Sequence, residues 1–67
     1  MKKRSVKIAG HSTSITMEDE FWDALKTLAR KQNRPLAALV AEVDAARDER
    51  NLSSALRVYA LKNLLTL

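Results

Sequence analysis

The chain has no cysteine, and it has only one histidine, one glycine and one proline. Without cysteine, disulfides and thiolate metal sites are excluded. A single imidazole, that of His11, does not make a structural zinc site. One glycine also excludes a glycine-rich loop that cradles phosphate. We therefore expect a protein that binds no metal and no cofactor.

Groups suited to catalysis are equally sparse. A serine–histidine pair would have to join His11 to Ser12, but consecutive side chains of a strand point to opposite faces. The carboxylates of residues 18–20 lie where the positive end of a helix dipole favours them. That placement explains them better than a catalytic pair does. The sequence therefore does not predict an enzyme.

Long apolar runs are also missing. No stretch approaches the ~20 apolar residues of a membrane span, and the basic start is not followed by the apolar segment of a signal peptide. No helix combines a strongly basic face with an apolar one, as helices that lie on anionic membranes do. We therefore expect a protein that does not contact membranes, and the absence of cysteine fits a cytoplasmic protein of bacterial type.

The length of 67 residues predicts a single domain, 1–67, with a limited core. A lone chain of this size buries only about 60% of the surface that its unfolded form exposes. Small folds usually gain stability from disulfides, a metal or a partner chain. Since the first two are excluded and 46% of the residues are hydrophobic, we expect a homodimer.

Positive charge is concentrated at the N-terminus. The net charge is +4, and residues 1–16 contain four cations and no acid: Lys2, Lys3, Arg4 and Lys7. Such a segment suits a polyanionic partner, because each neutralised phosphate releases counterions. It would equally suit a solubilising, disordered N-terminus. Charge alone does not decide between the two.

One short strand is predicted at residues 11–17, after a basic arm at residues 1–10. Alternation places one set of side chains on each face. The apolar-leaning face has Thr13, Ile15 and Met17, and the polar face has Ser12, Ser14 and Thr16. Residues 5–8 alternate as well, and we expect Gly10 to bend or end that piece.

Three helices follow, at residues 18–31, 35–47 and 52–65. The first has an apolar stripe at helical spacing. Asn33 suits the left-handed conformation that ends a helix, and Pro35 suits a first helical turn. The third helix is apolar around most of its circumference, so we expect it to pack on its own domain and also across a dimer interface.

A lone strand leaves backbone groups unpaired at each edge. Pairing with the same strand of a second copy would satisfy them in an antiparallel ribbon. The polar face of the ribbon would then face solvent, and a two-stranded ribbon fits the major groove of B-DNA. The alternative is that these hydroxyls are only the wet face of a strand.

Several segments resemble a known family. They are Lys3-Arg4-Ser5-Val6, Ile8-Ala9-Gly10-His11, Thr13-Ser14, Glu18, Phe21-Trp22-Asp23-Ala24-Leu25, Leu39-Val40-Ala41-Glu42-Val43-Asp44 and Asn51-Leu52-Ser53-Ser54-Ala55-Leu56-Arg57-Val58. This pattern resembles the ribbon-helix-helix proteins of the Arc/MetJ superfamily. The resemblance implies a mainly helical fold with one N-terminal strand, an intertwined homodimer whose strands form an intermolecular ribbon, and double-stranded DNA as partner.

The resemblance also implies roles for single residues. Base-facing positions are Ser12, Ser14 and Thr16, and relatives often have Arg or another long polar side chain where this chain has Ser12 and Thr16. Phosphate contacts are the backbone amides near Leu36 and Ala37, Arg34, and the cations Lys2, Lys3, Arg4 and Lys7. From strand alternation and the apolar helix faces, independently of the resemblance, we expect the dimer core to comprise Thr13, Ile15, Met17, Phe21, Leu25, Leu39, Val40 and Val43.

We therefore expect a transcriptional repressor that occupies a pseudo-palindromic operator as a dimer or as paired dimers. The alternative is an antitoxin-like or adaptor protein whose third helix binds a partner protein. The role of His11 is open between a contact to phosphate and a structural position beside Gly10, and we favour the structural one.

Overall fold

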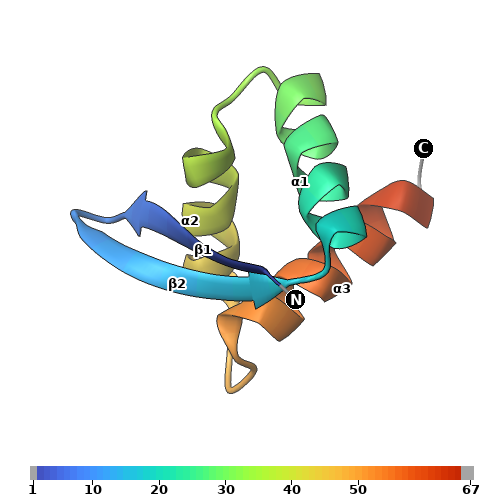
Figure 1. Ribbon diagram of the computed structural model, residues 1–67. Coiled ribbons are helices and arrows are strands. Elements are labelled where there is room, and N and C mark those ends of the chain that lie inside the picture. Colours follow the sequence, from blue (N-terminus) through green and yellow to red (C-terminus); the bar gives the residue numbers. More distant parts are fainter. Residues whose placement is uncertain (1, 66–67) are drawn as a thin grey trace.

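The computed structural model describes residues 2–65, which form two strands and then three helices. The strands are β1 (Lys2–Ile8) and β2 (His11–Met17), and the helices are α1 (Asp19–Lys31), α2 (Leu36–Ala46) and α3 (Leu52–Leu65). In Figure 1, α1 and α2 run in opposite directions, the β-hairpin lies beside them, and α3 crosses near their ends. The fold is mainly helical, as the sequence predicts.

The hairpin is antiparallel and regular. Its register runs from Lys2 opposite Met17 to Ile8 opposite His11. The two residues of the turn, Ala9 and Gly10, have φ values of 48° and 81°. Two positive φ values are what a two-residue type I′ turn requires, and this turn matches the natural twist of paired strands.

The interpretation of residues 1–10 as a basic arm is wrong, because residues 2–8 form β1. The apolar side chains of Val6 and Ile8 alternate with lysines, and Ile8 is 4% exposed in the core. Since β1 pairs with β2 inside one chain, the backbone groups along one edge of β2 have hydrogen-bond partners without a second copy. The prediction of a single strand therefore fails, whereas the predicted bounds of β2, 11–17, are confirmed.

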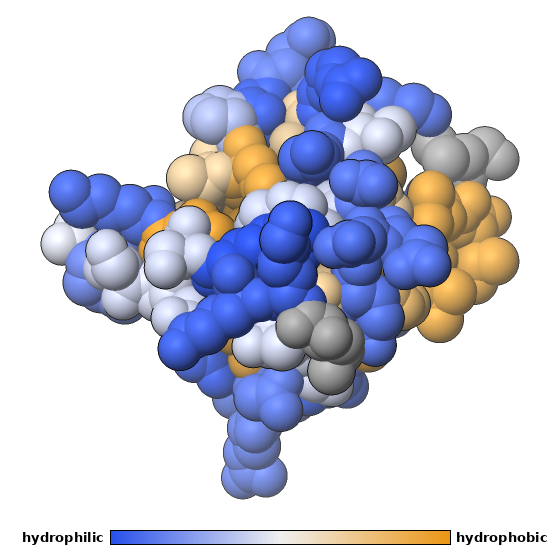
Figure 2. Space-filling model, viewed as in Figure 1, coloured by the Kyte–Doolittle hydropathy of each residue, from blue (hydrophilic) through white to orange (hydrophobic). Residues whose placement is uncertain are grey.

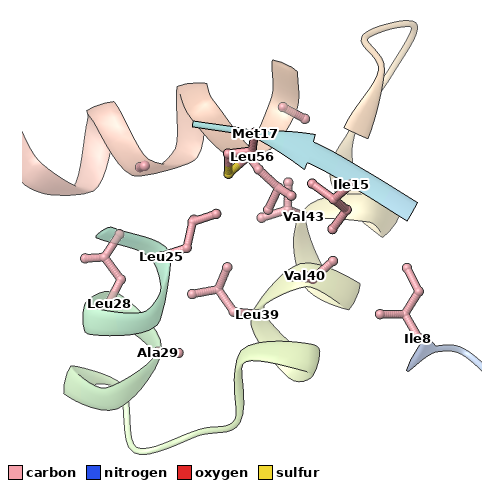
Figure 3. Close-up of a cluster of buried hydrophobic side chains, with 12 residues drawn as sticks. Ile8, Ile15, Met17, Leu25, Leu28, Ala29, Leu39, Val40, Val43 and Leu56 are labelled. Atoms are coloured by element: carbon pink, nitrogen blue, oxygen red, sulfur yellow. The ribbon is translucent and has the colours of Figure 1, made fainter. Parts of the chain in front are cut away.

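The core lies between the inner face of the hairpin and the helices (Figure 3). In that view the side chains of both strands and all three helices converge. Its buried members are Ile8, Ile15, Met17, Leu25, Leu28, Ala29, Leu39, Val40, Val43, Ala55, Leu56 and Ala60. Each fully buried large aliphatic side chain stabilises the fold by about 1.5–3 kcal/mol. Of the eight residues predicted for the dimer core, six are buried within this single chain, and Thr13 and Phe21 are half-buried. Their part in a dimer stays a prediction.

The helix ends match the predicted signals within one residue. Asn33 has a φ of 55°, the left-handed conformation expected there. Pro35 is extended and directly precedes α2, so it lies just outside the helix rather than in its first turn. Asn51 caps α3 through its side-chain oxygen, which accepts a hydrogen bond from the Ser54 amide at 2.8 Å.

The C-terminal half of α3 is only partly covered. Ala55, Leu56 and Ala60 are buried, but Leu61, Leu64 and Leu65 are 55%, 45% and 76% exposed. Figure 2 shows the resulting apolar patch at this end of the molecule, while most of the remaining face is hydrophilic. Within residues 2–65 no helix is both long and apolar enough to span a bilayer.

Candidate nucleic-acid interface

The solvent side of the hairpin is a continuous polar surface, which we call the outer face. It consists of three cross-strand pairs: Lys3 with Thr16, Ser5 with Ser14, and Lys7 with Ser12. All six residues are exposed, and their side chains share one side of the sheet because strand side chains alternate. The outer face therefore presents two ammonium groups and four hydroxyls, without an acid.

Acidic residues lie elsewhere in the molecule. All eight follow Met17 in the sequence, in α1, α2 and the segments next to them. The outer face therefore has an uncompensated positive charge close to groups that can both donate and accept hydrogen bonds. This combination suits a ligand with regularly spaced anions and polar edges between them.

The structure places the three predicted base-facing residues together on the outer face. Ser12, Ser14 and Thr16 are spaced two apart on β2, and each is exposed. Ser5, which the sequence interpretation left out, lies directly opposite Ser14. The alternation of residues 5–8 was the signal for it, because a strand there puts Ser5 on the same side as Lys3 and Lys7.

The four N-terminal cations do not act as one group. Lys3 and Lys7 belong to the outer face, whereas Lys2 is exposed at the start of β1, beside the carboxylates of residues 18–20. Arg4 lies on the inner side of the hairpin, where its side chain is only 18% exposed. Two of the four predicted phosphate contacts are therefore on the outer face.

Arg4 is held by two neighbours on α1. Its Nη2 donates a hydrogen bond to Oδ1 of Asp19 at 2.7 Å, and its guanidinium lies 4.8 Å from the ring centroid of Trp22. Its buried Nη1 has no hydrogen-bond partner among the described residues. The Arg4 hydrogen bond also lowers the pKa of the Asp19 carboxyl. These contacts give Arg4 a role in attaching β1 to α1.

Arg34, predicted to help bind phosphate, is likewise engaged inside the chain. Its guanidinium donates to both carboxylate oxygens of Glu42, at 2.9 and 3.2 Å, and its Nε donates to Gln32 at 2.7 Å. The Tyr59 hydroxyl is 3.4 Å away. The hydrogen bond from Arg34 lowers the pKa of Glu42. A phosphate at this position would compete with a bidentate carboxylate.

The first turn of α2, predicted to offer amides to phosphate, has no side-chain cap. The amides of Ala38 and Leu39 donate to the Pro35 carbonyl, at 3.0 and 3.3 Å. Leu36 and Ala37 are half-buried. Their role in binding phosphate stays a prediction.

His11 is exposed at the start of β2, opposite Ile8 and next to the turn. In the described part of the chain, no three metal-ligating side chains come together. An open groove of about 280 Å³ lies between α2 and α3, and it is lined by charged and small apolar residues such as Arg47, Ala55 and Lys62. The hydrogen bonds of Arg47 to Asp44 and to the Arg50 carbonyl hold one wall of this groove.

Comparison with known proteins bears on the whole chain. A family model described as the ribbon-helix-helix domain matches residues 1–64. The match covers the hairpin and all but the last residue of α3. Neither the curated proteins nor the solved structures contain a match to the chain.

Proposed function

The chain belongs to the ribbon-helix-helix domain family, a family of DNA-binding regulatory domains, and from this premise we propose that it is a dimeric transcriptional repressor. It acts in the cytoplasm by occupying an operator, with no chemical step. Two copies related by a two-fold axis match a pseudo-palindromic site, because the symmetry of the protein is then the symmetry of the two half-sites.

The outer face is the observation that supports this proposal. Its lysines match phosphates, whose contacts position a protein on the duplex, and its hydroxyls match base edges in the major groove. Hydroxyl groups can donate to or accept from any base edge, but they cannot make the bidentate contact that arginine makes with guanine. We therefore expect modest discrimination for each base pair.

Binding of the purified protein to duplex DNA across a salt series tests the proposal. Contacts to roughly four phosphates predict about a hundredfold loss of affinity between 50 and 200 mM salt. A chain that binds no duplex at 50 mM salt is not a DNA-binding regulator of this kind.

Sequence reading is tested with Ser14→Ala. Loss of one hydroxyl contact from each copy, about 1 kcal/mol per contact and about 2 kcal/mol per dimer, predicts a roughly 30-fold smaller preference for the best site over a scrambled one. Thr27→Ala is the matched control, because Thr27 is an exposed hydroxyl on α1, away from the hairpin. Equal effects of the two variants would contradict reading by the outer face.

A second function is supported by the apolar patch of α3. Leu61, Leu64 and Leu65 are spaced as one helix stripe, and all three are exposed. A stripe of this kind suits a groove on a partner protein, as in an antitoxin-like or adaptor protein. Binding of an apolar dye that Leu61→Gln/Leu65→Gln abolishes would support it. No dye binding by the native chain would contradict an accessible apolar patch and, with it, this second function.

A further inference from the structure

α3 has apolar side chains on two opposite sides. Leu56 and Ala60 lie on the side that is buried in the core. Because an α-helix has 3.6 residues per turn, Val58, Leu61 and Leu65 lie on the side that faces away from the core. Val58 is half-buried, and both leucines are exposed. We call these three residues the outer stripe of α3.

The outer stripe continues into the groove between α2 and α3. Val58 belongs to both surfaces, and small apolar side chains of the two helices, such as Ala46 and Ala55, line the groove. The leucines of the stripe belong to the apolar patch in Figure 2. From Ala55 to Leu65 this surface extends along α3 for roughly 15 Å, at about 1.5 Å per residue. That length accommodates about three turns of a second helix.

The carboxylates that line the groove are already bound within the chain. Glu42 accepts two hydrogen bonds from the guanidinium of Arg34, at 2.9 and 3.2 Å. Oδ1 of Asp48 accepts a hydrogen bond from the backbone amide of Arg50, at 3.3 Å. Each carboxylate of the groove therefore already has a hydrogen-bond donor.

Three cations line the same groove, Arg47, Arg50 and Lys62. Arg47 is paired with Asp44 at 2.7 Å. Lys62 is exposed, and it forms no ion pair with any of residues 2–65. The guanidinium of Arg50 likewise donates no hydrogen bond in the described part of the chain. The rim of the groove therefore offers two cationic donors beside the outer stripe.

A second copy of α3 does not supply the matching negative charge. α3 contains two cations, Arg57 and Lys62, but no aspartate or glutamate. Two copies packed about a two-fold axis through the outer stripe would bring their Lys62 side chains close together, because Lys62 is adjacent to Leu61. Like charges placed together in an interface oppose association. The charges therefore favour a partner of different sequence, with acidic side chains.

We propose that the outer stripe and the groove between α2 and α3 bind an amphipathic helix of another protein, in which acidic side chains flank the apolar stripe. The apolar side chains of this helix, at the spacing i, i+3, i+4 and i+7, pack on Val58, Leu61 and Leu65. Its carboxylates pair with Lys62 and Arg50, and these contacts select the partner and orient it. The proposal rests on the second function given above and adds the chemistry of the partner.

Two synthetic helical peptides of about 20 residues serve as probes. Both have leucines at the spacing i, i+3, i+4 and i+7 in an alanine background, and one has glutamates beside the leucines where the other has lysines. At low salt the native chain should bind the glutamate peptide at least about tenfold more tightly, as measured by fluorescence anisotropy. Salt at about 0.5 M should narrow the difference, because exposed ion pairs are screened. Equal affinities at low salt, or no binding of the glutamate peptide, would overturn the proposal.

Lys62→Glu tests the charge at the groove. The variant should lose the preference for the glutamate peptide, so that the ratio of the two affinities changes by about tenfold or more. Lys7→Glu is the matched control, because it makes the same change of net charge at an exposed residue of the hairpin. In Figure 1 the hairpin turn and the C-terminal end of α3 lie at opposite ends of the molecule. Equal effects of the two variants would show that net charge alone attracts the peptide, and the groove would be excluded as its site.

Leu61→Gln/Leu65→Gln tests the outer stripe. Both leucines are exposed, so the core of the single chain is retained. The variant should bind the glutamate peptide at least about tenfold more weakly, because two apolar contacts are lost. Sedimentation of the same variant tests the other occupant. If the variant forms a smaller assembly than the native chain, a second copy covers the outer stripe, and the proposal is overturned.

The apolar dye separates failure of this proposal from failure of the second function. If the native chain binds the dye but does not prefer the glutamate peptide, the apolar patch is accessible and only the acidic partner is excluded. If the native chain binds neither the dye nor the glutamate peptide, the second function fails as well.

Discussion

The guanidinium of Arg4 lies 4.8 Å from the ring centroid of Trp22, and the same side chain donates a 2.7 Å hydrogen bond to Asp19. One cation of β1 is thus stacked on an aromatic ring and paired with a carboxylate of α1. The cluster joins the hairpin to the helices at the point where the chain turns from β2 into α1. Together with the buried hairpin residues Ile8, Ile15 and Met17, it holds the outer face in place relative to the body.

Replacing Arg4 with alanine should destabilise the fold by about 1–2 kcal/mol, because the cation–π contact and the packing of the aliphatic stem are both lost. Arg4→Met keeps an aliphatic side chain and removes the buried, unpaired Nη1. The loss of stability should therefore be smaller for Arg4→Met than for Arg4→Ala. Urea unfolding followed by fluorescence of Trp22, the only tryptophan, measures both. Equal losses would show that the charge, not the stem, dominates.

Acid should weaken the fold through carboxylates that are paired in the native state. The hydrogen bond from Arg4 lowers the pKa of Asp19, and the hydrogen bonds from Arg34 lower that of Glu42. A lowered native pKa stabilises the fold above the ordinary values of 3.8 and 4.5, and this stabilisation is lost as pH falls through the native pKa. Melting temperatures should therefore begin to fall below about pH 5.

The matched variant for the acid response is Asp19→Asn/Glu42→Gln, in which neither group can titrate. Its melting temperature should be lower than that of the native chain at pH 7 and should depend less on pH between 5 and 3. Parallel pH profiles for the two proteins would show that other carboxylates, such as Glu18, determine the acid response. Glu18 has a lowered pKa, owing to a backbone hydrogen bond and to Arg57.

Two leucines of α3 should respond very differently to the same substitution. Leu56 is fully buried, and Leu56→Ala should cost about 2–5 kcal/mol because it leaves a cavity between α3, β2 and the other helices. Leu61 is 55% exposed, so Leu61→Ala should change the stability of the single chain by no more than about 0.5 kcal/mol. A large loss at Leu61 would show that another chain covers the apolar patch of α3.

The hairpin turn should be sensitive to backbone conformation alone. A Cβ added at Gly10 would meet no atom within 4 Å, so Gly10→Ala tests only the positive φ and should cost about 1–2 kcal/mol. Ala9 already has a positive φ, and Ala9→Asn should stabilise the turn by about 0.5–1 kcal/mol, since Asn-Gly is preferred there. Thermal unfolding measures both, and a neutral Gly10→Ala would contradict the turn.

The sequence predicts the helices and β2 because each has a complete local signal. Each signal can be recognised within a few residues of sequence: the acids at the start of α1, Asn33 after its end, and the apolar stripe along it. The sequence did not predict β1, because its lysines outnumber its apolar residues and the segment therefore resembles a solvated arm. Only Val6 and Ile8 mark its inner face, and their burial depends on helices that lie far away in sequence.

The sequence pattern did not predict the hydrogen-bond partners of individual side chains, for a similar reason. Arg4 was predicted to contact phosphate as one of the N-terminal cations, and Arg34 because of the family resemblance. Their actual partners, Asp19 and Glu42, are 15 and 8 residues away, and only the packed fold brings these charges together. Charge alone therefore identifies a basic segment but does not separate free cations from paired ones.

The pairing of β1 with β2 inside one chain has a consequence for how the molecule folds. Paired residues are at most 15 positions apart in the chain, between Lys2 and Met17, so the sheet closes by local search. Isolated hairpins close in about 1–10 μs, and this step does not wait for a collision with another molecule. Refolding of the sheet should therefore be first order, with a half-time that stays constant on dilution. A ribbon made from one strand of each copy would instead fold more slowly as the protein becomes more dilute.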